Sequence, residues 1–192
     1  MLTNPRSRSA LAAALRSEPG ASLGEVFTFL SSLYFRGKLA YARRFGLAFG
    51  ELPGAFVITP GRGLRHDSER IRLPDLVAMG SVAIDAANAE FTEPLRRDAE
   101  ALAALAPPAC EFVLLGSIAT DKYVRTLLAV LGERLVFPEA FVGRGDMSRG
   151  GLLLRSAREG ELLRTVPVAS SARRGARAPR IGSLTAPRGK RP

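Results

Sequence analysis

Two short segments of the sequence place paired arginines beside glycines and an aspartate. Arg62 and Arg65 belong to the first segment, and Arg144 and Arg149 belong to the second. Glycines let backbone amides approach an anion closely, and guanidinium groups bind phosphate or carboxylate through two hydrogen bonds. A neighbouring carboxylate can orient a ribose hydroxyl or activate water. These residue types therefore favour a pocket for a nucleotide or for the end of a nucleic acid.

The residues of this predicted site lie in four loops, each of which follows a predicted strand and contains an aspartate. The candidate catalytic residues, which would activate water or transfer a proton, are Asp67, Asp85 and His66. The candidate ligand- and phosphate-binding residues are Arg62, Gly63, Arg65, Ser117, Thr120, Arg144, Gly145, Asp146, Ser148 and Arg149. No metal site and no cofactor is predicted. These are also ordinary loop residues, so the alternative is that the arginines and aspartates pair with one another in a structural role.

A long amphipathic helix is predicted over residues 23–45. Ser22 and Glu25 have the spacing of a capping box, in which each residue satisfies a free amide of the other at the start of a helix. Gly46 offers a stop at the other end.

Tyr34, Lys38 and Tyr41 fall on one side of this predicted helix, because they are four and three residues apart. One interpretation is a surface that stacks on bases and contacts phosphate. The favoured interpretation is packing of the aromatic rings, with the lysine reaching outward.

Short apolar runs bounded by turn residues predict the strands. They cover residues 55–59, 81–85, 111–116 and 133–137, and a final run over 162–168 predicts an edge strand. Helices are predicted after Thr92, over 121–131, and from Ser148 to about Gly160.

Alternating strands and helices predict an α/β fold, a three-layer sandwich with a mainly parallel central sheet of about four to five strands flanked by helices. In such a sheet, ligands bind beyond the carboxyl ends of the strands. The turn with Arg62 and the turn with Arg144 are therefore expected to meet at one edge of the sheet.

Charge is distributed unevenly along the 192 residues. The formal net charge is +10, and residues 169–192 contain seven basic and no acidic side chains. The predicted organisation is a flexible N-terminal segment over 1–20, a single domain over 21–168, and a disordered basic tail over 169–192. The tail either assists binding to a polyanion in a salt-dependent manner or serves as a solubilising extension.

The single cysteine, Cys110, excludes an internal disulfide and any cysteine-rich metal site. The sequence has no uninterrupted apolar run of the length that spans a membrane. These features favour a cytoplasmic protein without a membrane partner.

Three stretches of the sequence carry a resemblance to a known group of proteins. They are SSLYFRGKLAYARRFG from residue 31, FVITPGRGLRHDS from residue 56, and FVLLGSIATDKYVRTLLAVLGERLVFPEAFVGRG from residue 112. Together they resemble uncharacterised bacterial domains similar to the uracil-DNA-glycosylase-like α/β fold found beside tRNA-guanine transglycosylase and archaeosine-synthesis enzymes. The matching positions are Ser32, Phe35, Tyr41, Gly63, Leu64, Gly116 and Tyr123.

The resemblance implies a three-layer α/β fold whose pocket at the strand ends handles nucleic acid or a nucleobase. The Asp-Pro-Tyr and His-Pro-Ser segments of true uracil glycosylases do not occur in this sequence. The resemblance therefore transfers no catalytic residue.

Three functions are consistent with the sequence. The first is a nucleic-acid-associated protein that binds a nucleotide or nucleobase, with hydrolase or N-glycosidase activity as an option. The second is a non-catalytic module that interacts with nucleic acid or protein. The third is an enzyme that acts on an anionic metabolite.

Overall fold

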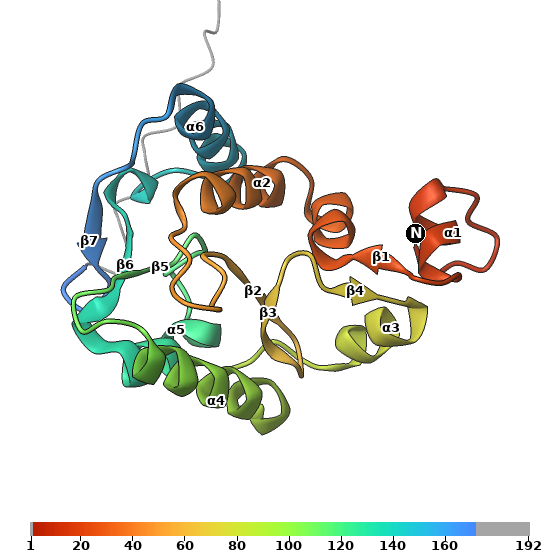
Figure 1. Cartoon of the computed structure of the whole chain (residues 1–192), viewed down its shortest axis with the longest axis horizontal. Helices are drawn as coiled ribbons and strands as arrows, with labels where there is room; N and C mark the ends of the chain where they lie inside the picture. The colour runs from red at the N-terminus through yellow and green to blue at the C-terminus, as the bar shows by residue number, and fades with distance from the viewer. Residues whose placement is uncertain (1, 172–192) are drawn as a thin grey trace, which may run out of the picture.

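The computed structural model describes residues 2–171, which form helices and short strands (Figure 1). In chain order the elements are α1 (Ala10–Leu15), β1 (Ala21–Ser22), α2 (Leu23–Phe45), β2 (Phe56–Thr59), β3 (Gly63–His66), β4 (Arg70–Ile71), α3 (Leu73–Ser81), α4 (Ala89–Leu105), β5 (Phe112–Val113), α5 (Asp121–Leu131), β6 (Leu135–Pro138), α6 (Asp146–Glu159) and β7 (Thr165–Pro167). Short 3-10 helices precede and follow β6, at Gly132–Arg134 and Glu139–Phe141. Most of the predicted tail lies outside the described residues.

The predicted central sheet is wrong, because the described strands form three small sheets. β1 pairs with β4 and β2 pairs with β3, both antiparallel, while β5, β6 and β7 form the third sheet. Within this part of the chain only β5 and β6 are parallel, with Phe112 opposite Leu135. β7 adds to β6 as an antiparallel edge strand, as predicted for the final apolar run.

The turn after β2 explains why a parallel sheet does not form there. Gly61 has a φ of +72° and Gly63 a φ of +74°, a backbone conformation that glycine adopts without a steric penalty. The chain therefore reverses within a few residues, and β3 returns beside β2 as a hairpin. A parallel crossover would need a longer connection.

The predicted helices are confirmed in position, with changes at their starts. α2 covers the predicted 23–45, and both hydrogen bonds of its capping box are present. α5 covers the predicted 121–131. α4 begins after Asn88, whose side chain accepts from the Glu90 amide, and not after Thr92. α6 begins at Asp146, before Ser148.

The predicted strand over 81–85 does not form. Ser81 is the last residue of α3 and Val82 follows it as the C-terminal cap. Val82 is buried in a connection that packs on the core. A short apolar run is therefore compatible with such a connection and with a strand, and it does not distinguish between them.

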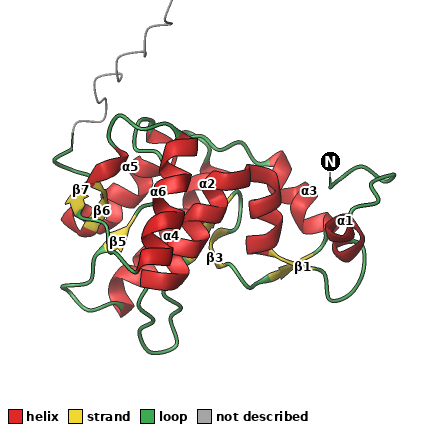
Figure 2. Ribbon diagram, turned by 90° about the horizontal axis from the view of Figure 1, so that it is seen from above, coloured by secondary structure: helices red, strands yellow, loops and turns green. Residues whose placement is uncertain are grey.

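The buried side chains form two separate clusters. Figure 2 shows β5, β6, β7 and α5, which belong to one of them, toward one end of the molecule, and α1, α3 and β1, which belong to the other, toward the opposite end. The larger cluster fills the space between α4, α5, α6 and the three-stranded sheet, with Phe91, Phe137 and Phe141 at its centre. The smaller cluster joins α1, α3, β1, β4 and the beginning of α2. The sequence predicts a flexible segment over residues 1–20, and the structure buries Leu2 and Leu15 of that segment in the smaller cluster.

The helix α2 connects the two clusters and is bent. Gly24 and Leu39 would lie about 22 Å apart along a straight helix. In the structure, a Cβ atom added to Gly24 would lie 3.0 Å from Cδ2 of Leu39. The helix therefore folds back between these residues, within a stretch that contains two adjacent serines at 31 and 32. Serine pairs are a common cause of sharp helix bends.

Candidate functional site

The second half of α2 crosses α6 at very short distance. A Cβ atom added to Gly37 would lie 2.5 Å from the carbonyl oxygen of Gly150, and one added to Gly150 would lie 2.9 Å from Cα of Tyr34. The two glycines thus allow backbone contact between the helices. This contact places the start of α6 next to the side chains that α2 projects on the same side.

A cleft of about 450 Å³ lies beside this crossing, and we call it the α2–α6 cleft. The side chains that line it come from α2, from the loop after β5, from α5 and from α6: Ser31, Tyr34, Phe35, Lys38, Ser117, Tyr123, Asp146 and Met147. Its volume is in the range of small-molecule sites. Of the predicted binding residues, the cleft includes Ser117 and Asp146.

Two tyrosines hold the loop that forms one wall of the cleft. The Tyr34 hydroxyl donates to the Leu115 carbonyl (3.0 Å), and the Tyr123 hydroxyl donates to the Ser117 carbonyl (2.8 Å). Gly116 lies between these carbonyls, and a Cβ atom there would be 2.4 Å from the Tyr123 hydroxyl. Burial raises the pKa of Tyr123 to about 12 and raises that of Tyr34 as well. Both hydroxyls therefore remain donors at neutral pH.

Lys38 provides the positive charge inside the cleft. Its Nζ lies 4.0 Å from the centre of the Tyr34 ring, a cation–π contact. Burial lowers the pKa of Lys38, the nearby carboxylate of Asp146 counteracts the shift, and the guanidinium of Arg149 adds to it. The lysine is thus partly desolvated and gains from an anion placed next to it.

The start of α6 adds an arginine and a carboxylate. Arg149, whose side chain is only 15% exposed, donates to the Phe141 carbonyl from Nε (3.2 Å) and Nη2 (3.1 Å). Its Nη1 lies 3.7 Å from Oδ1 of Asp146, whose side chain is 69% exposed. Arg149 is therefore fixed by the fold, while the carboxylate of Asp146 remains accessible at the edge of the cleft.

Three other predicted residues lie at this end of α6. Gly145 is the N-cap and has no side chain to satisfy the amides of the first turn. Arg144 donates from Nη1 to the hydroxyl of Ser148 (3.2 Å), and both side chains are exposed. The predicted phosphate-binding segment is thus the uncapped beginning of a helix.

The first arginine pair has a different environment. Arg62 contacts Glu69 (Nη2 to Oε1, 2.6 Å) and Asp75 (Nη1 to Oδ1, 3.5 Å), and Nε of Arg65 lies 4.0 Å from Oε2 of Glu69. Gly63 contacts α4, because a Cβ atom there would lie 2.6 Å from the Pro94 carbonyl oxygen. These arginines pair with carboxylates close to them in the sequence, Glu69 and Asp75, as the structural alternative predicts.

The two arginine pairs have no sheet edge in common. Arg62 lies in the turn between β2 and β3, which form a sheet of their own, whereas Arg144 lies after β6, the middle strand of the sheet of β5, β6 and β7. The two turns were expected to meet at one edge of a parallel central sheet. Because that sheet does not form, this expectation is wrong as well.

Of the predicted catalytic residues, His66 contacts both Asp67 and a serine. Nδ1 of His66 lies 2.5 Å from the hydroxyl of Ser68, and Nε2 lies 3.4 Å from Oδ1 of Asp67. The carboxylate of Asp67 is buried and accepts from Nε (2.9 Å) and Nη2 of Arg43. Hydroxyl, imidazole and carboxylate thus follow one another in the order used for nucleophile activation.

The remaining predicted residues have local roles. Asp85 is exposed, and its Oδ1 accepts from the Ala87 amide (2.8 Å) in the turn before α4. Thr120 precedes α5 without a side-chain capping bond, and the Ser117 hydroxyl accepts from the Ala119 amide (3.3 Å). Between residues 2 and 171, no three His, Cys, Asp or Glu side chains are grouped in a way that could hold a metal ion.

The prediction of site residues omitted Tyr34, Lys38 and Tyr123. The spacing of Tyr34 and Lys38 on one face of a helix was the available signal, and packing was the favoured interpretation of it. Tyr41 does pack, since it is buried and its hydroxyl accepts from the Leu163 amide (3.0 Å). Tyr123 entered the sequence argument through the resemblance, together with the glycine that it contacts.

None of the described helices is both long and apolar enough to cross a membrane. Comparisons of the chain with protein-family models, with curated proteins and with solved structures found no match.

Proposed function

We propose that the protein binds a nucleotide or nucleobase in the α2–α6 cleft. The observation that carries this proposal is the partly buried ammonium group of Lys38, 4.0 Å from the centre of the Tyr34 ring in a cleft of about 450 Å³. A cation beside an aromatic ring suits a ligand that has both a negative charge and a flat ring system.

The anionic part of the ligand is proposed to lie between Lys38 and the beginning of α6. The first amides of a helix point outward without intrahelical acceptors and carry partial positive charge. Gly145 leaves them uncapped. The exposed side chains of Arg144 and Ser148 add further donors at the same helix end.

Asp146 is proposed to recognise the other part of the ligand. A carboxylate accepts hydrogen bonds from the N–H groups of a nucleobase or from ribose hydroxyls, and its charge disfavours a second anionic group at that position. Because Arg149 lies 3.7 Å from one of its oxygens, the carboxylate is oriented before the ligand binds.

Isothermal titration with nucleoside monophosphates and triphosphates tests the proposal. We expect Lys38→Met to weaken binding at least about tenfold, because a charged hydrogen bond is lost from a desolvated site. Lys122→Met is the matched control, since Lys122 is exposed on α5 and outside the lining of the cleft. Equal binding by the parent and Lys38→Met, or no binding by the parent, would show that the assignment is wrong.

A second candidate function, hydrolysis through a serine nucleophile, is favoured by the 2.5 Å contact between Ser68 and His66. An activated serine reacts covalently with a fluorophosphonate probe. Labelling of the parent and of Ser81→Ala, but not of Ser68→Ala, would support this function. Failure of the probe to label the parent would exclude it.

A further inference from the structure

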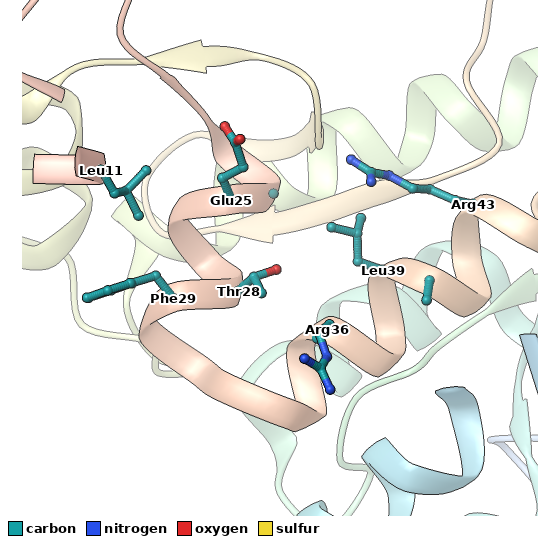
Figure 3. Close-up of a pocket in the computed structure, with 9 residues that line it drawn as sticks. Leu11, Glu25, Thr28, Phe29, Arg36, Leu39 and Arg43 are labelled. Carbon is teal, nitrogen blue, oxygen red and sulfur yellow. The ribbon is translucent and has the colours of Figure 1, made fainter. Parts of the chain in front are cut away.

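A second hollow lies inside the bend of α2, on the side where the two halves of the helix face each other (Figure 3). Its volume is about 480 Å³. Phe29 and Thr28 come from the first half of α2, Arg36 and Leu39 from the second half, and Leu11 from α1. We call it the elbow pocket.

Two charged side chains, Glu25 and Arg43, line one end of the elbow pocket. Arg43 is held by the buried Asp67, whose backbone carbonyl also accepts from the Gly24 amide (2.8 Å). Glu25 is held by Ser22, whose amide (3.1 Å) and hydroxyl (2.7 Å) donate to the glutamate carboxylate. Both charged groups at this end therefore have partners already.

Arg36 is the available charge of the elbow pocket. Among the side chains that the structure describes, its guanidinium has no hydrogen-bond or ion-pair partner. Figure 3 shows it at the end of the pocket away from Glu25, with Phe29 on the facing half of the helix. Phe29 is 53% exposed, although aromatic rings of this size are mostly buried in folded proteins.

We infer that the elbow pocket binds a medium-chain aliphatic carboxylic acid in its free form. The chain would lie along Leu11, Phe29 and Leu39, and the carboxylate would form a salt bridge with Arg36, near the hydroxyl of Thr28. The reverse orientation is disfavoured, because at the other end the carboxylate would meet the negative charge of Glu25 and an arginine, Arg43, that is already paired with Asp67. Apolar walls with one convergent charged group are the usual composition of a site for an amphiphilic ligand.

Titration calorimetry with decanoate tests this inference on the full chain. Decyltrimethylammonium has the same chain length with the opposite charge, and acetate has the same head group without the chain. We expect decanoate to bind, and the other two to bind at least about tenfold more weakly, because both the chain and the carboxylate contribute to affinity. Binding of decyltrimethylammonium as tight as that of decanoate would overturn the inference.

The variant Arg36→Gln is expected to lose at least about tenfold in decanoate affinity. Arg155→Gln is the matched control, since Arg155 is an exposed arginine on α6 outside the lining of this pocket. Lys38→Met is expected to bind decanoate like the parent, so the elbow pocket and the α2–α6 cleft are tested separately. Unchanged decanoate binding by Arg36→Gln, in a protein with unchanged circular dichroism, would also overturn the inference.

Discussion

The ion pair between Arg43 and Asp67 is the contact whose removal is expected to reveal most about the bend of α2. The side chain of Asp67 is 4% exposed, whereas that of Arg43 is 57% exposed. Loss of Arg43 and loss of Asp67 are therefore expected to differ in their cost to stability. Water can replace Asp67 as the partner of an exposed guanidinium, but it has little access to a carboxylate that has lost Arg43.

The unequal exposure sets the expected size of each effect. Arg43→Met keeps most of the apolar stem and leaves the buried carboxylate without its arginine, a change that costs about 3–5 kcal/mol in the free energy of unfolding. His66 remains near Oδ1, at 3.4 Å, so the lower end of that range is expected. Asp67→Asn keeps the volume and loses a charged hydrogen bond, which costs about 1.5–3 kcal/mol.

Urea unfolding of the parent, both single variants and the double variant measures the coupling between the two residues. We expect Arg43→Met to be less stable than Asp67→Asn, and the double variant to be at least as stable as Arg43→Met. The backbone bond from Gly24 to Asp67 is present in all four proteins. A loss of stability in Arg43→Met no greater than that in Asp67→Asn would show that the buried carboxylate does not depend on Arg43.

Two further predictions concern a glycine turn and the titration of a tyrosine. Gly63 and Gly143 both have a positive φ near +70°, but of the two only Gly63 would bring an added Cβ atom against other atoms, 2.6 Å from the Pro94 carbonyl oxygen. Urea unfolding should therefore show Gly63→Ala to be about 1–3 kcal/mol less stable than Gly143→Ala. Equal losses of stability in the two variants would refute the role of packing at Gly63. The pKa of Tyr123 is raised by burial from 10.0 to about 12, so its stabilisation is present below pH 10 and is lost as pH rises towards 12. Between about pH 8 and about pH 11 the parent should therefore lose about 1.4 kcal/mol more than Tyr123→Phe, and parallel pH profiles would contradict the shift.

The helices were predictable from the sequence because their signals are local. The capping box of Ser22 and Glu25 and the spacing of apolar residues define α2 over its whole length. The same holds for α5, where Val124, Leu127 and Leu131 form the buried side. These patterns depend on residues three or four positions apart, so no knowledge of the tertiary structure is needed.

The sheets were not predictable in the same way, because strand pairing depends on distant residues. The run Phe56–Thr59 is short and apolar, which suits a strand covered on both faces as well as one half of a hairpin. The turn at Gly61 and Gly63 decides between them, and its glycines were interpreted as anion-binding residues. The bend of α2 was also missed, because a capping box and a continuous apolar pattern contain no information on helix direction.

The bend gives α2 a role in both proposed binding sites. Arg36 and Lys38 are two residues apart, so they project from different sides of the same helical turn. Arg36 lines the elbow pocket and Lys38 lines the α2–α6 cleft. Any movement of the second half of α2 that opens or closes the elbow therefore also moves Lys38 relative to the first half. Gly37, between them, holds this turn against Gly150 of α6, so the start of α6 would move together with Lys38.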